Sequence, residues 1–205
     1  MRRLVLAGSL ALLGGALWWR RNPSAMPYWQ RFFVELPHPG ITRERLVEVL
    51  EPAPRERLLE VGPGTGYYSL AIAERLGDRG RLEVYDLQRE MVDHVLRAAA
   101  DRGLRNVTGW TGDAQDMLFE KDRFDGAYLT VMLGEIPDQD AALRELARVV
   151  KPGGRIVVGE IALDPHYVTF ASLRERAGRA GLELERRAGS AFAYFARFRV
   201  PPATA

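Results

Sequence analysis

The chain has 205 residues, of which 47% are hydrophobic, and its formal net charge at pH 7 is +2. This length supports one substantial hydrophobic core, which predicts a single α/β-sized domain. Cysteine is absent and the three histidines lack metal-ligand spacing, so disulfide bonds and thiol chemistry are excluded and no metal site is expected.

The positive charge is concentrated in the first 21 residues, which hold four arginines and no acid. Without them the chain has 25 basic and 27 acidic residues, so the remainder is slightly negative. A nucleic-acid-binding protein normally carries its positive charge on the folded domain. The excess here accompanies the most hydrophobic stretch instead, which favours a membrane surface as partner and argues against nucleic acid.

That stretch is an uncharged run of sixteen residues from Leu4 to Trp19, with an arginine pair on each side. We expect residues 1–21 to form a hydrophobic helix that anchors the protein at the cytoplasmic face of a membrane. The run spans roughly 24 Å as a helix, and snorkelling arginines can extend it toward the ~30 Å hydrocarbon core. No small-residue cleavage site follows, so a signal peptide fits poorly. Two alternatives are a helix docked on the domain and a protein that begins at Met26.

Residues 22–41 are rich in aromatic residues and proline and are expected to form a connector or a lid, with the domain proper at 42–205. Thr42 can cap a helix over RERLVEVL, whose apolar residues lie on one face. From residue 57 onward, strand-like and helix-like segments alternate. Strands are predicted at 57–62, 81–86, 106–110, 124–130 and 154–160, and helices at 66–76, 88–102, 138–150 and 168–180.

The predicted strands do not alternate polar and apolar residues, as RIVVGE illustrates. This pattern is typical of a parallel sheet that is covered on both faces. After the last helix, LELERRAG and FAYFARFRV are separated by only a short break, which predicts an antiparallel hairpin. We therefore predict an α/β fold with a Rossmann-like, doubly wound sheet of seven strands, mostly parallel and ending in an antiparallel hairpin, with the N-terminal hydrophobic helix in addition.

The sequence EVGPGTG, which holds Gly62, Gly64 and Gly66, joins the first strand to the next helix. Such a turn lets the backbone approach a ligand closely, but several unrelated cofactors use it. The dinucleotide fingerprint needs a small residue where this chain has Tyr67. A phosphate-binding P-loop needs a Gly-Lys-Ser/Thr sequence, which the turn lacks. The turn therefore argues against both a dinucleotide and a nucleoside triphosphate.

Several motifs in order make residues 40–200 resemble the class I S-adenosylmethionine-dependent methyltransferases. LLEVGPGTG resembles the first motif of that family, LEVYDLQREMVD places an acid at the end of the second strand, and TGDAQDM places another after the third. FDGAYLTVMLGEIPDQDAALRELARVVKPGGRIVVGE resembles the family's fourth strand, the following helix and the fifth strand. The resemblance is to the small group that includes quinone-biosynthesis and phospholipid N-methyltransferases, and it implies S-adenosylmethionine as cofactor.

The resemblance also implies the residues that bind the cofactor. Asp86 is expected to accept hydrogen bonds from the ribose hydroxyls, and Asp113 to hold the adenine amino group. Glu60 lies in an apolar strand, where an unpaired carboxylate is costly, and is expected to meet the cofactor's amino group. Simpler roles are a helix cap for Asp86 and a loop acid for Asp113. The expected cofactor-binding residues are Glu60, Gly62, Gly64, Gly66, Asp86, Leu87, Asp113, Ala114 and Leu129.

Methyl transfer from a sulfonium is an in-line displacement, so the protein has mainly to align the reactants and exclude water. A base is needed only if the nucleophile arrives protonated. The candidates are Glu135, Tyr128 and His38, with His166 after the fifth strand as a further one. The aromatic residues of the connector are expected to cover the cofactor or to contact the membrane interface: Tyr28, Trp29, Phe32 and Phe33.

The expected acceptor is a small or lipid-like molecule met at the membrane, such as a quinone ring or a phospholipid amine. Two other interpretations remain open. The protein is either a soluble methyltransferase whose tail docks on the domain, or a non-catalytic protein that binds S-adenosylmethionine. A homodimer is compatible with each of them.

Overall fold

The computed structural model describes residues 24–29 and 40–202. The predicted N-terminal helix, Phe32, Phe33 and His38 lie outside the described residues. Among the helices of the described part, none is both long and apolar enough to span a bilayer. In chain order the elements are α2 (Arg43–Leu50), β1 (Arg57–Val61), α3 (Ser69–Leu76), β2 (Arg81–Asp86), α4 (Arg89–Asp101), β3 (Val107–Thr111), β4 (Phe124–Thr130), the short 3₁₀ helix η2 (Leu133–Glu135), α5 (Gln139–Val149), β5 (Val150–Ile161), α6 (Phe170–Arg179), β6 (Glu183–Gly189) and β7 (Ala193–Arg199).

The strands form one seven-stranded sheet in the order β3-β2-β1-β4-β5-β7-β6. Strands β1 to β5 are mutually parallel, whereas β7 lies antiparallel between β5 and β6. The predicted doubly wound α/β fold with a C-terminal antiparallel hairpin is thereby confirmed. The strand order reverses between β1 and β4, and in open α/β sheets ligands bind beyond the carboxyl ends of the strands at such a reversal.

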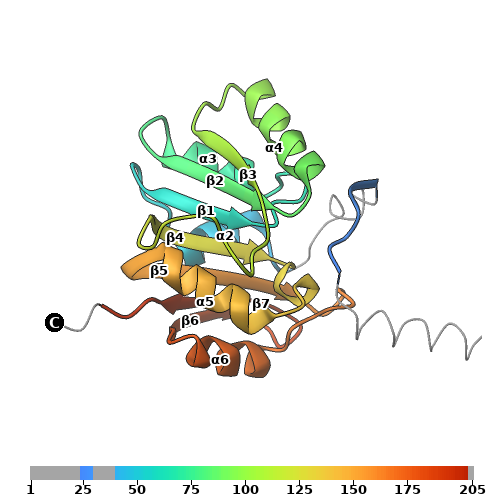
Figure 1. Cartoon of the computed structure of the whole chain (residues 1–205), viewed down its shortest axis with the longest axis vertical. Coiled ribbons are helices and arrows are strands. Elements are labelled where there is room, and N and C mark those ends of the chain that lie inside the picture. Colours follow the sequence, from blue (N-terminus) through green and yellow to red (C-terminus); the bar gives the residue numbers. More distant parts are fainter. Residues whose placement is uncertain (1–23, 30–39, 203–205) are drawn as a thin grey trace, which may run out of the picture.

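Helices cover both faces of the sheet (Figure 1). On one face α2, α3 and α4 bury apolar side chains such as Leu46, Ile72 and Val95. On the other face α5 and α6 bury Leu143 and Leu173. Because the central strands are covered on both sides, their side chains are apolar in both directions, as the unalternating sequence indicates.

Strand β5 begins four residues earlier than predicted, at Val150 directly after α5. Phe124 pairs with Val150 and Gly126 with Arg155, so β5 advances five residues where β4 advances two, and the KPGG sequence bulges out of the pairing. Gly153 in this bulge has a φ of +78°, which glycine adopts without strain. Its N–H donates to the carbonyl of Val200 at 2.8 Å, which ties the bulge to the end of the chain.

Candidate functional site

A cavity of about 290 Å³ lies beyond the carboxyl ends of β1, β2 and β4, where the strand order reverses. The end of β2 contributes Asp86 and Leu87, and the loop after β3 contributes Asp113 and Ala114. The structure thus brings four of the predicted cofactor residues, together with Glu135, around one cavity. The other lining residues are Ser24, Ala25, Val61, Tyr85, Gly112, Gln115, Met132, Ile136 and Pro137.

The glycine-rich turn packs against the loop after β4, which lines this cavity. Gly62, Gly64 and Gly66 all have positive φ, at +69°, +55° and +86°, which residues with a Cβ adopt only with strain. A Cβ on Gly62 would also lie 2.5 Å from Cγ of Met132, a cavity residue from the loop after β4. The three glycines are not themselves among the lining residues. They let the chain turn from β1 into α3 while the loop after β4 packs directly over the turn.

Asp86 ends β2 and is buried at the wall of the cavity. One carboxylate oxygen accepts a hydrogen bond of 2.8 Å from the N–H of Gln88. This bond closes a turn just before α4 and does not cap the helix, and it occupies only part of the carboxylate. Burial raises the pKa of Asp86 to about 6, and the backbone N–H groups of Gln88 and Leu87 work against this rise. A ligand that donates hydroxyl protons would stabilise the charged form.

The neighbouring wall combines apolar surface with amide and carboxylate groups. The apolar side chain of Leu87 is 56% exposed, and both Leu87 and the buried Ala114 line the cavity. A flat aromatic ring between them would bury surface that now faces solvent. Asp113 accepts from the backbone N–H of Gln115 at 2.8 Å and from its side-chain amide at 2.9 Å and 3.0 Å. Gln115 thus fixes the Asp113 carboxylate, whose free lone pairs can still accept from an amino group.

Glu60 is buried in β1 and is not among the lining residues. Burial raises its pKa to about 7, and the hydroxyls of Ser69 and Tyr128 partly offset the effect. Within the described part of the chain, Glu60 Oε2 and both hydroxyls make no hydrogen bond of good geometry. A buried carboxyl group with so few good hydrogen bonds is unstable as an anion, and an ammonium group near the turn would stabilise the charged form.

Two predicted site residues face the interior of the protein instead of the cavity. Leu129 is fully buried in the core under α5 and α6. Tyr128 is fully buried on the opposite face, and burial raises the pKa of its hydroxyl well above the ordinary value. Tyr128 therefore remains protonated and lies outside the cavity lining, which argues against it as a base. His166 lines a separate groove of about 270 Å³ between η2 and α6.

Glu135, at the end of η2, is the catalytic candidate that lines the cavity. Its Oε2 accepts a 3.0 Å hydrogen bond from the backbone N–H of Met26. Burial raises the pKa of Glu135 to about 7, and the carboxylates of Asp164 and Asp86 add to the rise, against the Met26 N–H. A carboxyl group with a pKa near neutrality is well suited to accept a proton at physiological pH.

Residues 24–29, part of the predicted connector or lid, form a further part of the site, although the sequence did not indicate which contacts hold them. Ser24 and Ala25 line the cavity, and this segment, drawn in blue, crosses the carboxyl end of the sheet (Figure 1). The side chain of Gln88 holds it by two hydrogen bonds, from Tyr28 N–H at 2.9 Å and to Met26 C=O at 2.8 Å. A local signal in the sequence was a glutamine at the N-cap position of α4, where its side chain makes no capping hydrogen bond.

These groups together fit S-adenosylmethionine. The cofactor carries a sulfonium and an ammonium, and the buried carboxyl groups of Asp86 and Glu60, with the half-buried Glu135, provide negative charge beside or beneath the cavity. Carboxylate oxygens can accept from its ribose hydroxyls and amino groups, and Leu87 and Ala114 can pack against adenine. Within the described residues no cluster of three His, Asp or Glu side chains could hold a metal ion.

Comparison with known proteins supports this fit. Residues 58–154 match the family described as methyltransferase domain. The chain is 35% identical over 115 residues to the aklanonic acid methyltransferase DauC of Streptomyces sp. (strain C5), covering 55% of this chain and 51% of that protein. It is 30% identical over 125 residues to the ubiquinone/menaquinone biosynthesis C-methyltransferase UbiE of Shewanella frigidimarina, covering 60% and 50%. The chain therefore spans about half the length of these curated relatives.

The fold is likewise that of a solved S-adenosylmethionine-dependent methyltransferase from Aquifex aeolicus. The TM-score is 0.78 at 16% sequence identity, over 86% of this chain and 100% of that one. At this identity the likeness establishes the fold alone. The family match covers β1 to β4 and the loops after β2, β3 and β4 that line the cavity, which supports S-adenosylmethionine as the cofactor. Residues 58–154 thus match a methyltransferase domain, and the chain has the fold of the class I S-adenosylmethionine-dependent methyltransferases.

Proposed function

We propose that the protein transfers a methyl group from S-adenosylmethionine to a small, hydrophobic acceptor at the cytoplasmic face of a membrane. The observation that carries the reaction is the placement of Glu135. Its carboxyl group, with a pKa raised to about 7, shares one cavity with Asp86, the predicted ribose ligand. Relatives named for aklanonic acid and for ubiquinone and menaquinone biosynthesis support a small-molecule acceptor.

S-adenosylmethionine supplies an electrophilic methyl group on a positively charged sulfur. The protein's own groups hold and orient it: Asp86 at the ribose, Asp113 at the adenine amino group, and Glu60 at the amino group of the methionine portion. Residues 24 and 25 close one side of the cavity and limit the access of water. Glu135 removes the proton from an acceptor hydroxyl or carbon acid as the new bond to the methyl carbon forms.

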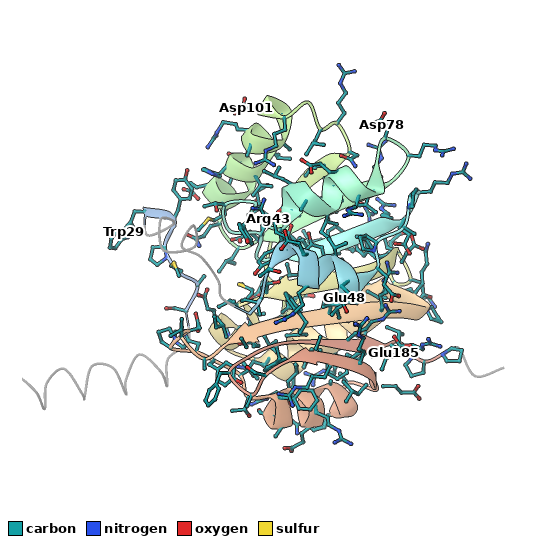
Figure 2. The ribbon with its side chains drawn as sticks, turned by 180° about the vertical axis from the view of Figure 1, so that it is seen from behind. Trp29, Arg43, Glu48, Asp78, Asp101 and Glu185 are labelled. Atoms are coloured by element: carbon teal, nitrogen blue, oxygen red, sulfur yellow. The ribbon has the colours of Figure 1, made fainter. Side chains whose placement is uncertain are left out.

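The membrane location rests on the hydrophobic run from Leu4 to Trp19 and on the rim of the domain. Three large apolar side chains are largely exposed: Trp29 at 66%, Leu163 at 79% and Phe192 at 73%. The N–H of Ala162 donates to the carbonyl of Phe192 at 2.7 Å, which holds the loop after β5 against the hairpin turn. These loops follow the carboxyl end of β5, and Trp29 projects from residues 24–29 at the periphery (Figure 2). All three therefore belong to the edge of the sheet on which the cavity lies.

The formation of S-adenosylhomocysteine tests the reaction whatever the chemical identity of the acceptor. Full-length protein with S-adenosylmethionine is given either the organic-soluble or the aqueous fraction of a cell extract. Turnover stimulated by the organic fraction, and absent in Asp86→Ala, supports the proposal. Stimulation by the aqueous fraction alone would favour the soluble methyltransferase, and cofactor binding without turnover in either fraction would favour the non-catalytic alternative.

A mutation at the rim tests the membrane contact separately. Leu163→Asp and Phe192→Asp together should lower the fraction of protein that binds anionic phospholipid vesicles. Leu118→Asp is the matched control, because Leu118 is 80% exposed but lies beside Met117 and Phe119, whose carbonyls accept from Arg148 near the end of α5. Equal vesicle binding by both variants would contradict a membrane-facing rim.

A further inference from the structure

The contacts of Gln88 go beyond what the reaction requires and indicate a separate role. Gln88 follows directly after Asp86 and Leu87, the two cavity residues at the end of β2, and immediately precedes α4. This N-cap position normally favours Ser, Thr, Asp or Asn, whose short side chains accept from the first backbone N–H groups of the helix. The Gln88 side chain makes no such bond, so α4 forgoes a cap at this position.

The side-chain amide of Gln88 is used instead by the backbone of residues 26–28. Its Oε1 accepts from Tyr28 N–H at 2.9 Å, and its Nε2 donates to Met26 C=O at 2.8 Å. One primary amide thus pairs with both a donor and an acceptor of the segment, as a neighbouring β-strand would. Of the twenty side chains only Gln and Asn offer this pair of groups, and Asn is one methylene shorter.

Two further contacts hold the same segment. Met26 N–H donates to Glu135 Oε2 at 3.0 Å, and the Tyr28 hydroxyl lies 3.2 Å from Nδ1 of His94 on α4. Gln88 and His94 belong to the β2 side of the cavity, whereas Glu135 belongs to the loop after β4. The segment therefore bridges the two walls between which the cavity lies, and Ser24 and Ala25 at its beginning line that cavity.

We propose that Gln88 is a positioning residue for cofactor binding, which fixes the backbone of residues 26–28 so that Ser24 and Ala25 form a wall of the cofactor cavity. Cofactor can then leave only when these hydrogen bonds open. The proposal concerns the residence of S-adenosylmethionine and S-adenosylhomocysteine, and it does not depend on the identity of the acceptor or on where the N-terminal run resides.

The dissociation rate of S-adenosylhomocysteine from the full-length protein, measured by stopped-flow displacement, tests the proposal. Gln88→Ala removes both hydrogen bonds and should accelerate dissociation about tenfold, the effect of losing one to two ordinary hydrogen bonds. Gln88→Glu has the same size but, when ionised, cannot donate to Met26 C=O. Gln139→Glu in the first turn of α5 makes the same chemical change away from the cofactor cavity and should leave the rate unchanged.

The pH dependence separates this role from a general weakening of the fold. The carboxyl group that Gln88→Glu introduces regains one donor when it is protonated. This variant should therefore dissociate at least as fast as Gln88→Ala at pH 8 but more slowly at pH 4, below the ordinary pKa of a glutamate carboxyl group. The titratable groups around the segment are Asp86, His94 and Glu135, with Asp164 and Glu160 beyond Glu135. Both variants contain all of them, so their titration cancels in the ratio of the two rates. A ratio that does not change with pH would overturn the proposal.

Hydrogen exchange of residues 24–29, measured by mass spectrometry on the same samples, locates the effect. We expect Tyr28 N–H to be protected in the wild type with S-adenosylhomocysteine bound, and to exchange faster in Gln88→Ala. Faster exchange with an unchanged dissociation rate would show that the segment is not a wall of the cofactor site. Faster dissociation with unchanged exchange would assign the effect to α4. Either result would overturn the proposal.

Discussion

The Asp86 carboxylate should make cofactor affinity depend on pH in a way that an isosteric change removes. Its pKa of about 6 in the free protein means that it is ionised at pH 8 and about nine-tenths protonated at pH 5. Ribose hydroxyls donate to the ionised form. Hydrogen bonds to a charged group contribute about 1.5–3 kcal/mol, so Asp86→Asn should weaken S-adenosylmethionine binding roughly 10- to 100-fold at pH 8. At pH 5 the wild type has itself lost most of this charge, and the ratio of the two dissociation constants should be about tenfold smaller.

Isothermal titration of wild type and Asp86→Asn with S-adenosylmethionine from pH 5 to pH 8 measures this ratio. Glu60 and Glu135 titrate in the same range but are present in both proteins, so their contributions cancel. Asp101→Asn, at the far end of α4 (Figure 2), is the control and should bind like the wild type at every pH. A ratio that stays constant between pH 5 and pH 8 would show that the Asp86 carboxylate does not hold the ribose.

Three further outcomes are expected. Glu60→Gln should stabilise the cofactor-free protein by up to about 3 kcal/mol at pH 8, because a pKa raised from 4.5 to about 7 destabilises the fold increasingly between these pH values and fully above 7. The gain should shrink at pH 5.5 in urea unfolding, and a less stable variant at pH 8 would contradict the assignment. Gly62→Ala should lower the free energy of unfolding by about 2–4 kcal/mol, since its Cβ would lie 2.5 Å from Met132 and its φ is +69°. Adding Met132→Ala should regain part of that loss in the same assay, and no regain would exclude the clash. Glu135→Gln should slow S-adenosylhomocysteine formation about 10²- to 10⁴-fold while cofactor affinity changes less than about threefold. The wild-type rate should also fall as the pH drops below about 7. An unchanged rate in Glu135→Gln would exclude Glu135 as the base.

The predictable parts of the molecule are those whose cause is local in sequence. Unalternating apolar runs and glycine at the turn after β1 predicted the parallel sheet and its crossover. The resemblance to the class I methyltransferases implied Asp86, at the end of β2, and Asp113, after β3, as cofactor ligands. The structure brings both of them, with Leu87 and Ala114, to the same cavity.

The unpredicted parts depend on contacts between distant residues. In a strand buried on both faces the sequence offers no alternation to tell the two faces apart, so the burial of Tyr128 on one face and Leu129 on the other was not evident. The segment at 24–29 is fixed by Gln88 and Glu135, about 60 and 109 residues along the chain, and has no periodicity of its own. The early start of β5 depends on a bulge that only its pairing with β4 reveals.

Transfer of label from methyl-labelled S-adenosylmethionine is the decisive measurement for the proposed reaction. Full-length protein, Asp86→Asn and Leu163→Asp are incubated with a membrane fraction, and the products are separated into organic and aqueous phases. We expect the wild type to place label in an organic-soluble product, Asp86→Asn to place little at pH 8, and Leu163→Asp to recover activity when the acceptor is dispersed in detergent. Label confined to water-soluble products, or label in the organic phase that is as abundant with Asp86→Asn as with the wild type, would contradict a membrane-associated acceptor methylated at this cavity.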